Sequence, residues 1–108
     1  MEIADLIADE PESVSTWTHR VYERIRRQPL TDAAWRSLFD LGVGTALARR
    51  DMDGLRSVLA LAATYYDSIG DQFGCLPEFE ATMERVLDDP QARAVVLECT
   101  HDILIGNS

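Results

Sequence analysis

The sequence predicts an all-α protein: a small single domain, residues 1–108, built as a bundle of about five antiparallel helices in stacked hairpins, with a short extra helix at the N-terminus. Two observations carry this prediction. Apolar side chains recur at intervals of three and four residues, the period of an amphipathic helix, and the segments between them hold the caps and breakers that start and end helices. No segment alternates apolar and polar residues over the length of a strand, so no sheet is expected.

Three helices are predicted in the first half of the chain. The short leading helix is indicated by its apolar residues, Ile3, Leu6 and Ile7. The next helix begins at Pro11, a residue favoured in a first helical turn, and ends before Pro29. Its apolar face is formed by Val14, Trp17, Val21 and Ile25. The third covers residues 33–50 behind the N-cap Thr31, and apolar residues surround most of it, which is typical of a central helix.

Three more helices are predicted in the second half. A helix capped by Asp51 ends before Gly70, because glycine is the usual residue just beyond a helix C-terminus. Residues 70–77 hold two glycines and a proline and form the longest loop. A short helix then covers residues 79–88, and a final helix covers residues 90–106, with a proline in its first turn.

Glycines and tryptophans indicate how the helices pack. Gly42 and Gly44 lie inside a helix, where each glycine costs about 1 kcal/mol relative to alanine. We therefore expect a neighbouring helix to approach the backbone closely at these glycines. Trp17 and Trp35 lie on apolar faces and are predicted to anchor the core. The centre of the bundle is predicted over residues 33–69.

The charge of the chain restricts its partners and its compartment. Nineteen acidic residues against ten arginines, with no lysine, give a net charge of −9. This charge repels phosphate backbones and anionic lipids, so direct nucleic-acid binding and membrane binding are disfavoured. An acidic N-terminus and the lack of an apolar run long enough for a membrane span predict the cytoplasm. There Cys75 and Cys99, which form no CxxC motif, are expected to stay reduced.

No pattern in the sequence indicates catalytic, metal or cofactor chemistry. His19 and His101 have no second His, Cys or Asp at the i+3 or i+4 spacing that binds a metal from one helix face. Cys99 and His101 are two positions apart and would point to different sides of a helix. Gly42-Val43-Gly44 lacks the third glycine of a dinucleotide-binding turn and follows no strand. We therefore expect a non-enzymatic protein without a metal or a cofactor.

Five residues are candidates for binding a partner. Arg20, Arg24 and Arg27 recur at intervals of four and three residues, so they form one stripe on an otherwise anionic molecule. The stripe is either a docking patch or a solvated face whose charges pair with neighbouring acids. Tyr65 and Tyr66 are adjacent on a helix, so we expect one ring in the core and the other at its rim, where tyrosines favour protein interfaces.

The sequence holds more apolar residues than one small core needs. Leu61 and Leu104 fall outside the main apolar stripes of their helices. Such residues predict an exposed apolar patch, and large exposed patches mark interaction sites. The patch would be covered by a partner protein or by a second copy of the chain in a homodimer.

The segment from Trp35 to Gly70 resembles a helix pair of the tetratricopeptide type. The resemblance rests on the helix lengths, the small residues of the first helix, the tight acidic turn and the ending from Tyr66 to Gly70 and Asp71. It covers about a third of the chain and lacks the recurrence that defines the family's repeats. The resemblance implies stacked antiparallel helix pairs, whose grooves accept a partner's helix or an extended peptide.

These features predict a non-enzymatic protein–protein interaction module: an adaptor, a chaperone-like protein or an inhibitory subunit that binds through helical grooves and the five candidate residues. The alternative is an acidic protein that imitates nucleic acid and inhibits a nucleic-acid-binding enzyme, as a phage-encoded anti-defence protein does. Acids in two rows at phosphate spacing would favour imitation, and scattered acids around an apolar groove would favour the module. A DNA-binding helix-turn-helix is disfavoured because its recognition helix, residues 52–69, holds a single basic residue, Arg56.

Overall fold

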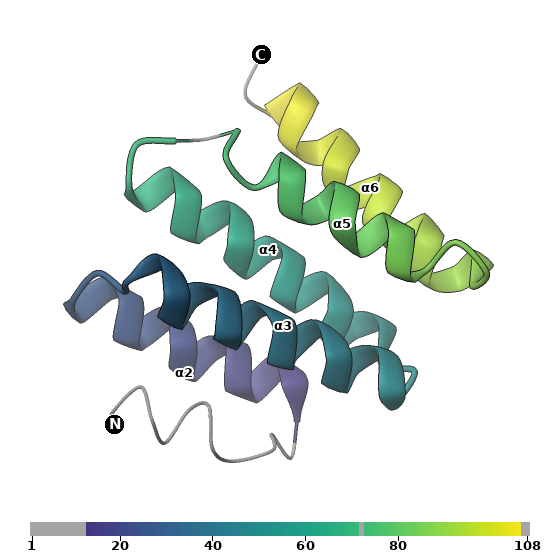
Figure 1. Ribbon diagram of the computed structural model, residues 1–108, viewed down its shortest axis with the longest axis horizontal. Helices are drawn as coiled ribbons and strands as arrows, with labels where there is room; N and C mark the ends of the chain where they lie inside the picture. Colours follow the sequence, from purple (N-terminus) through teal and green to yellow (C-terminus); the bar gives the residue numbers. More distant parts are fainter. Residues whose placement is uncertain (1–12, 72, 107–108) are drawn as a thin grey trace.

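Residues 13–71 and 73–106 are described by the computed structural model, and they form five α-helices and no strand (Figure 1). The helices are α2 (Val14–Arg27), α3 (Asp32–Ala48), α4 (Met52–Ser68), α5 (Leu76–Arg85) and α6 (Pro90–Gly106). The predicted all-α bundle is confirmed. The leading helix predicted around Ile3, Leu6 and Ile7 lies outside the described residues. None of the five helices combines the length and the apolar character needed to cross a membrane.

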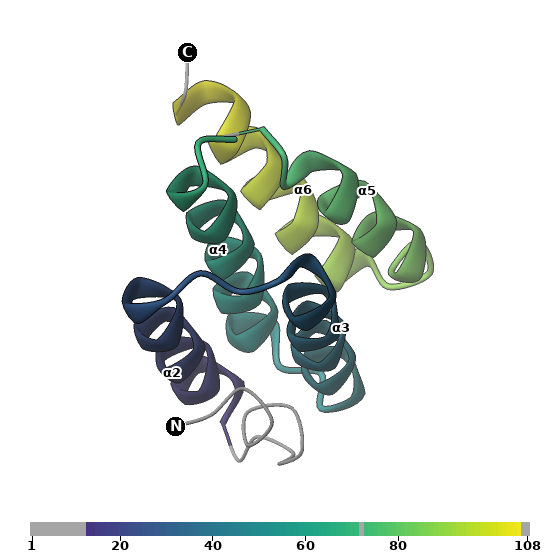
Figure 2. The same cartoon turned by 60° about the vertical axis from the view of Figure 1, so that its left-hand side comes forward.

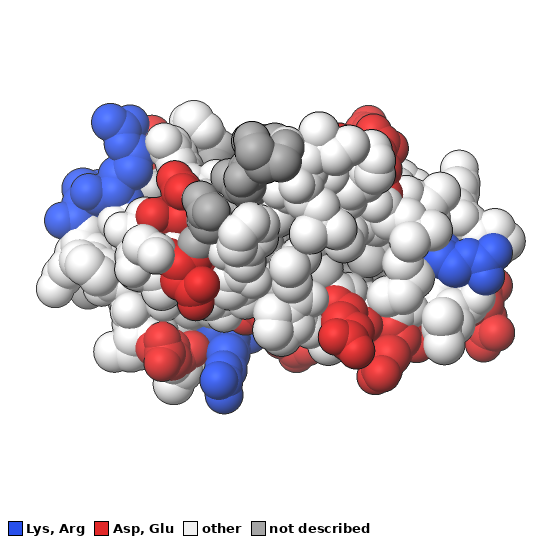
Figure 3. All heavy atoms as spheres, turned by 90° about the horizontal axis from the view of Figure 1, so that it is seen from above, with Lys and Arg blue, Asp and Glu red and all other residues white. Residues whose placement is uncertain are grey.

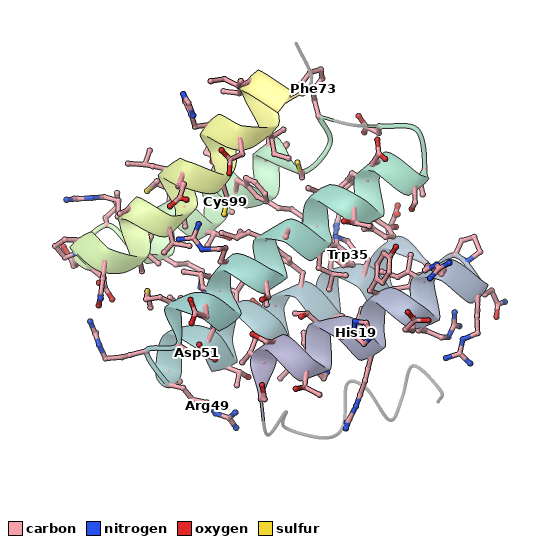
Figure 4. All side chains as sticks on the ribbon, turned by 180° about the vertical axis from the view of Figure 1, so that it is seen from behind. His19, Trp35, Arg49, Asp51, Phe73 and Cys99 are labelled. Carbon is pink, nitrogen blue, oxygen red and sulfur yellow. The ribbon has the colours of Figure 1, made fainter. Side chains whose placement is uncertain are left out.

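The five helices are arranged in two layers. Helices that follow one another in the chain run antiparallel, with α2, α4 and α6 side by side in one layer and α3 and α5 in the other (Figure 1 and Figure 2). α4 lies at the centre and packs against α2, α3 and α6. The layer of α3 and α5 covers one face of α2, α4 and α6. In the described part of the chain no further helix covers the opposite face, which is seen in Figure 4.

The first three helices begin at side chains that accept a hydrogen bond from the backbone. Ser13, Thr31 and Asp51 each accept from the N–H three residues later, over 3.4, 3.1 and 2.9 Å. Such caps satisfy N–H groups that have no partner within the helix. Thr31 and Asp51 are the caps that the sequence predicts. The sequence predicts that the second helix starts at Pro11, which lies outside the described residues. In the structure α2 begins later, at Val14, because Ser13 caps it.

Two residues with positive φ form the turns on either side of α4. Arg50 (φ 52°) lies between α3 and α4, and Gly70 (φ 80°) follows α4. Beyond Gly70, the N–H of Asp71 donates to the carbonyl of Tyr66 over 2.9 Å, a bond typical of a Schellman ending. Gly70 is the helix stop that the sequence predicts, because a side chain is disfavoured in the left-handed region.

α5 is shifted from its predicted range of residues 79–88. It starts at Leu76, because Pro77 is tolerated within the first turn of a helix and need not belong to the preceding loop. It ends at Arg85, because the backbone of the next residue, Val86 (φ −119°, ψ 14°), leaves the helical conformation, while the Val86 side chain remains buried at 2% exposure. Both predicted ends of this helix are therefore wrong.

The core lies between the two layers and around α4. Its largest fully buried side chains are Trp35, Phe79, Leu38, Leu55 and Leu59. Trp17 is 4% exposed and Trp35 is 1% exposed, so both tryptophans anchor the core as predicted. A Cβ on Gly42 would lie 2.7 Å from Cζ3 of Trp17, whereas a Cβ on Gly44 would meet nothing closer than 3.6 Å. The close approach expected at these two glycines therefore occurs at Gly42.

Candidate protein-interaction surface

We define the open face as the side of α2, α4 and α6 that α3 and α5 leave uncovered (Figure 4). The two sides of α4 differ in their side chains. Val58 and Ala62 are fully buried, whereas Ser57 is half-buried and Ala60 and Thr64 are exposed. Because residues three and four positions apart share a helix face, the last three form a row of small side chains along the open face. A depression lies on each side of this row.

The first depression lies between the C-terminal halves of α2 and α4, and we call it the α2/α4 hollow. Its volume is about 350 Å³, and its apolar lining comes from Tyr22, Ile25, Pro29, Tyr65 and Ile69. Arg26 and Asp67 add charges of both signs to the lining. The Arg26 guanidinium lies 5.7 Å from the centre of the Tyr22 ring and 3.7 Å from a carboxylate oxygen of Glu23. The hollow is therefore an apolar recess with charged groups beside it.

The second depression lies between α4 and α6, and we call it the α4/α6 groove. Its volume is about 340 Å³, and its apolar lining comes from Leu59, Ala60, Ala63, Phe79, Cys99 and Ile103. Arg56 and Asp102 add charges to it. Nη1 of Arg56 lies 2.8 Å from Oε1 of Glu98, and this hydrogen bond holds the pKa of Glu98 below its usual value. Ala60 belongs to both the groove and the row of small residues, so the groove opens onto α4.

The two candidate tyrosines occupy different environments. Tyr65 is 2% exposed and stacks on Trp35, with ring centres 4.4 Å apart and an interplanar angle of 7°. Tyr66 is half-buried, and its ring packs edge-on against Tyr65 at 5.1 Å. One core tyrosine and one rim tyrosine are present, as predicted. An exposed surface that contains both rings is not formed, because Tyr65 is used in the core against Trp35.

Glu78 is a half-buried carboxylate held by two hydrogen-bond donors. The Tyr66 hydroxyl donates to its Oε1 over 2.8 Å, and the indole N–H of Trp35 donates to the same oxygen over 2.9 Å. Burial raises the pKa of Glu78 above its usual value, and the two hydrogen bonds oppose that rise. Burial also raises the pKa of the Tyr66 hydroxyl, together with its bond to Glu78. We assign this cluster the structural role of tying α5 to α3 and α4.

The predicted arginine stripe lies on a different flank of α2 from the hollow. Residues two positions apart on a helix point about 200° apart, so Arg24 faces away from Tyr22 and Arg26. Arg20 and Arg27 are exposed, and Arg24 is half-buried. The structure therefore does not bring the three predicted arginines together with the candidate tyrosines. The hollow receives a different arginine, Arg26, which follows the stripe on the neighbouring flank.

The sequence also singles out two leucines predicted to lie outside the core and two cysteines. Leu61 is 5% exposed, because α4 packs against α2 on that side, so it belongs to no exposed patch. Leu104 is 52% exposed on α6. The thiol of Cys75 is buried and that of Cys99 is half-buried, and burial raises the pKa of each. Within the described part of the chain, no three His, Cys, Asp or Glu side chains form a group that could hold a metal ion.

Comparison with known proteins gives no relative: no family model matches the chain, and neither a curated protein nor a solved structure shows significant similarity to it.

Of the residues that line the two depressions, the sequence singled out Tyr65 as a candidate for partner binding but not the others. Tyr22 and Arg26 are four positions apart, so their common helix face could have been recognised. Ser57, Ala60 and Thr64 likewise recur at helical spacing, opposite the apolar stripe of α4. Which helices lie across from these residues depends on how α2 and α6 pack on α4, and helical periodicity does not encode that packing.

Proposed function

We propose that this protein is a non-enzymatic, cytoplasmic protein–protein interaction module that binds an amphipathic helix of a partner on its open face. The observation that carries the proposal is the pair of depressions beside α4, of about 350 and about 340 Å³, each with an apolar lining. An amphipathic helix binds by laying its apolar stripe into such a groove between helices.

The length of the open face suits a partner helix. A shallower recess of about 290 Å³, lined in part by His19 and Ser57, extends the α2/α4 hollow along α2. From Ser57 to Ser68, α4 rises about 16 Å, which corresponds to about three turns of a bound helix. Figure 4 places His19 and Cys99 on opposite sides of α4, so a helix lying along the row of small residues would have a depression on each side of it.

The side chains of the open face are suited to packing against a partner helix. The exposed residues Ala60 and Thr64 are small, and small residues allow the backbone of a packed helix to come close. Apolar side chains of the partner would enter the α4/α6 groove against Phe79 and Ile103. Polar side chains of the partner would meet Arg56 and other charged groups beside the groove, so the proposed interface has an apolar centre and a polar edge.

Charge placement favours this function over imitation of nucleic acid. On the face shown in Figure 3, the acids form separate groups with uncharged surface and arginines between them. An imitation of a duplex requires two rows of acids at phosphate spacing. Partner binding that changes little with added salt would support the interaction module, because apolar contacts are not screened by ions.

Photo-crosslinking from single positions tests the proposal. The photoreactive residue p-benzoylphenylalanine is placed at Ala60 on the open face, and as a control at Ala81, an exposed alanine on α5, in cells that make the protein. We expect crosslinks from Ala60 to one partner segment whose apolar residues recur every three or four positions, and none from Ala81. Equal crosslinking from both positions, or no crosslink from Ala60, would contradict the proposal.

A further inference from the structure

α2 has a charge opposite to that of the rest of the chain. It carries four arginines and one glutamate, a net charge of +3, so the other residues together carry −12. Figure 3 shows one group of arginines at the left end of the molecule, where α2 ends in Figure 1, and further arginines at the lower edge and at the right end. A positive region on an anionic protein attracts anionic groups of a partner to one place.

Three of these arginines, Arg20, Arg24 and Arg27, form the stripe described above, which we now call the arginine row and which spans two turns or about 10 Å of α2. Nη1 of Arg24 donates to the carbonyl of Gln28 over 2.8 Å, and Nε of Arg27 donates to the carbonyl of Glu23 over 3.4 Å. Each bond uses one of the five N–H donors of a guanidinium and restrains its side chain. The other donors of this arginine row remain available to a partner.

The arginine row lacks the acidic partners that other arginines of the chain have. Arg50, Arg56 and Arg85 form ion pairs of 3.4, 2.8 and 3.2 Å with carboxylates. On α2, Glu23 pairs with Arg26, which lies outside the row. Within the described residues, no carboxylate therefore holds the guanidinium groups of the arginine row in an ion pair.

We propose that the arginine row binds an acidic helical segment of a partner protein, whose carboxylates recur at intervals of four and three residues. A guanidinium binds a carboxylate through two parallel hydrogen bonds, which makes arginine the residue suited to this recognition. Carboxylates on one face of a helix repeat with the same rise as the arginines of α2, so a helix lying along α2 meets all three. This surface lies on a different flank of α2 from the hollow and is independent of the open face.

A nucleic acid fits the arginine row less well than an acidic helix does. A long polyanion extends beyond about 10 Å, and its further phosphates would meet a surface on which the remaining residues carry −12. A short acidic helix places all its charges over the row. We therefore expect the arginine row to recognise short anionic segments. A single-stranded oligonucleotide serves as the alternative ligand in the test below.

Fluorescence anisotropy with the full chain tests this inference. The probe is a labelled, alanine-based helical peptide with glutamates at intervals of four and three residues, and its control carries glutamine instead. We expect the glutamate peptide to bind more weakly as salt is added. The Arg20→Glu, Arg27→Glu variant should weaken its binding by at least about tenfold. Arg36→Glu with Arg93→Glu, two exposed arginines outside α2, makes the same change in net charge and should alter affinity by less than about twofold.

A charge swap completes the test. A lysine version of the peptide should bind the Arg20→Glu, Arg27→Glu variant more tightly than it binds the unmodified chain. Equal losses of affinity in the two double variants would overturn the proposal, because they would report net charge alone. It is equally overturned if the glutamine peptide binds as well as the glutamate peptide, or if an oligothymidylate binds more tightly. Circular dichroism establishes that both variants are folded.

Discussion

The two sides of α4 belong to one regular helix of 17 residues and yet present different surfaces. Towards α3 and α5, Val58, Ala62 and Tyr65 are at most 2% exposed. Towards the open face, Ala60 and Thr64 are exposed. The difference lies in the neighbours of the helix, since its backbone is continuous. One helix therefore forms the core on one side and exposes small side chains on the other.

Truncation of a covered side chain should have the largest effect on stability. Leu55→Ala removes a fully buried side chain and leaves a cavity, so the free energy of unfolding should fall by about 2–5 kcal/mol in urea denaturation. Leu97→Ala on α6 makes the same chemical change at a residue that is 56% exposed, and should alter stability by less than about 0.5 kcal/mol. Comparable losses in the two variants would contradict the described packing.

The two glycines of α3 should respond in opposite directions. Gly42→Ala places a methyl group 2.7 Å from the Trp17 ring and 3.0 Å from Val58, and overpacking of this kind costs about 1–3 kcal/mol. Gly44→Ala meets only Nη2 of Arg85 at 3.6 Å, an ordinary contact, and should stabilise the helix by up to about 1 kcal/mol. Thermal unfolding of both variants tests this contrast, and a loss of stability in both would refute it.

The cluster around Glu78 predicts a stability effect that depends on pH. Tyr66→Phe removes a donor to the carboxylate and should cost about 1–2 kcal/mol near neutral pH. The variant raises the pKa of Glu78 in the folded state further, while the pKa in the unfolded state is unchanged. Burial holds the folded-state pKa of Glu78 above the usual value for a glutamate, so the loss is present at a pH above that pKa and shrinks as the pH falls through it.

Urea denaturation near neutral pH and at a pH below the folded-state pKa of Glu78 measures the effect. Tyr22→Phe is the control, because the Tyr22 hydroxyl has no hydrogen bond to a described residue, and its effect should not depend on pH. A loss for Tyr66→Phe that stays constant with pH would contradict the role given to Glu78.

The smallest effect is expected on the open face. Ala60→Leu should change the free energy of unfolding by less than about 0.5 kcal/mol, because the added side chain enters no packed region. Ala62→Leu, two positions later and fully buried, should cost about 1–3 kcal/mol by overpacking. Chemical denaturation of this pair measures the contrast between the two sides of α4 within one helix. Equal costs would mean that Ala60 is covered.

The fold was largely predictable because its determinants act locally. Thr31, Asp51 and Gly70 start or end helices where the sequence indicates, since each acts through bonds within a few residues. The ends of α5 were misplaced for two reasons. Pro77 is compatible with both a loop and a first helical turn, and the burial of Val86 depends on helices that are distant in the sequence.

The candidate site was less predictable, because it is formed between helices. Helical spacing identifies a row such as Arg20, Arg24 and Arg27, but it does not reveal which flank of α2 faces α4. The stacking of Tyr65 on Trp35 and the position of Arg26 in the α2/α4 hollow follow from packing between helices. Long-range packing of this kind has no periodic signal in a single sequence.

Occupation of the open face by a partner is tested most directly by comparing Ala60→Trp with Ala81→Trp in affinity capture, quantified by mass spectrometry from cells that make the protein. Both positions are exposed alanines in helices, so the two variants should keep the stability of the unmodified chain to within about 0.5 kcal/mol. We expect Ala60→Trp to lose a partner that the unmodified chain and Ala81→Trp both retain. Retention of the same partners by both variants would contradict this expectation.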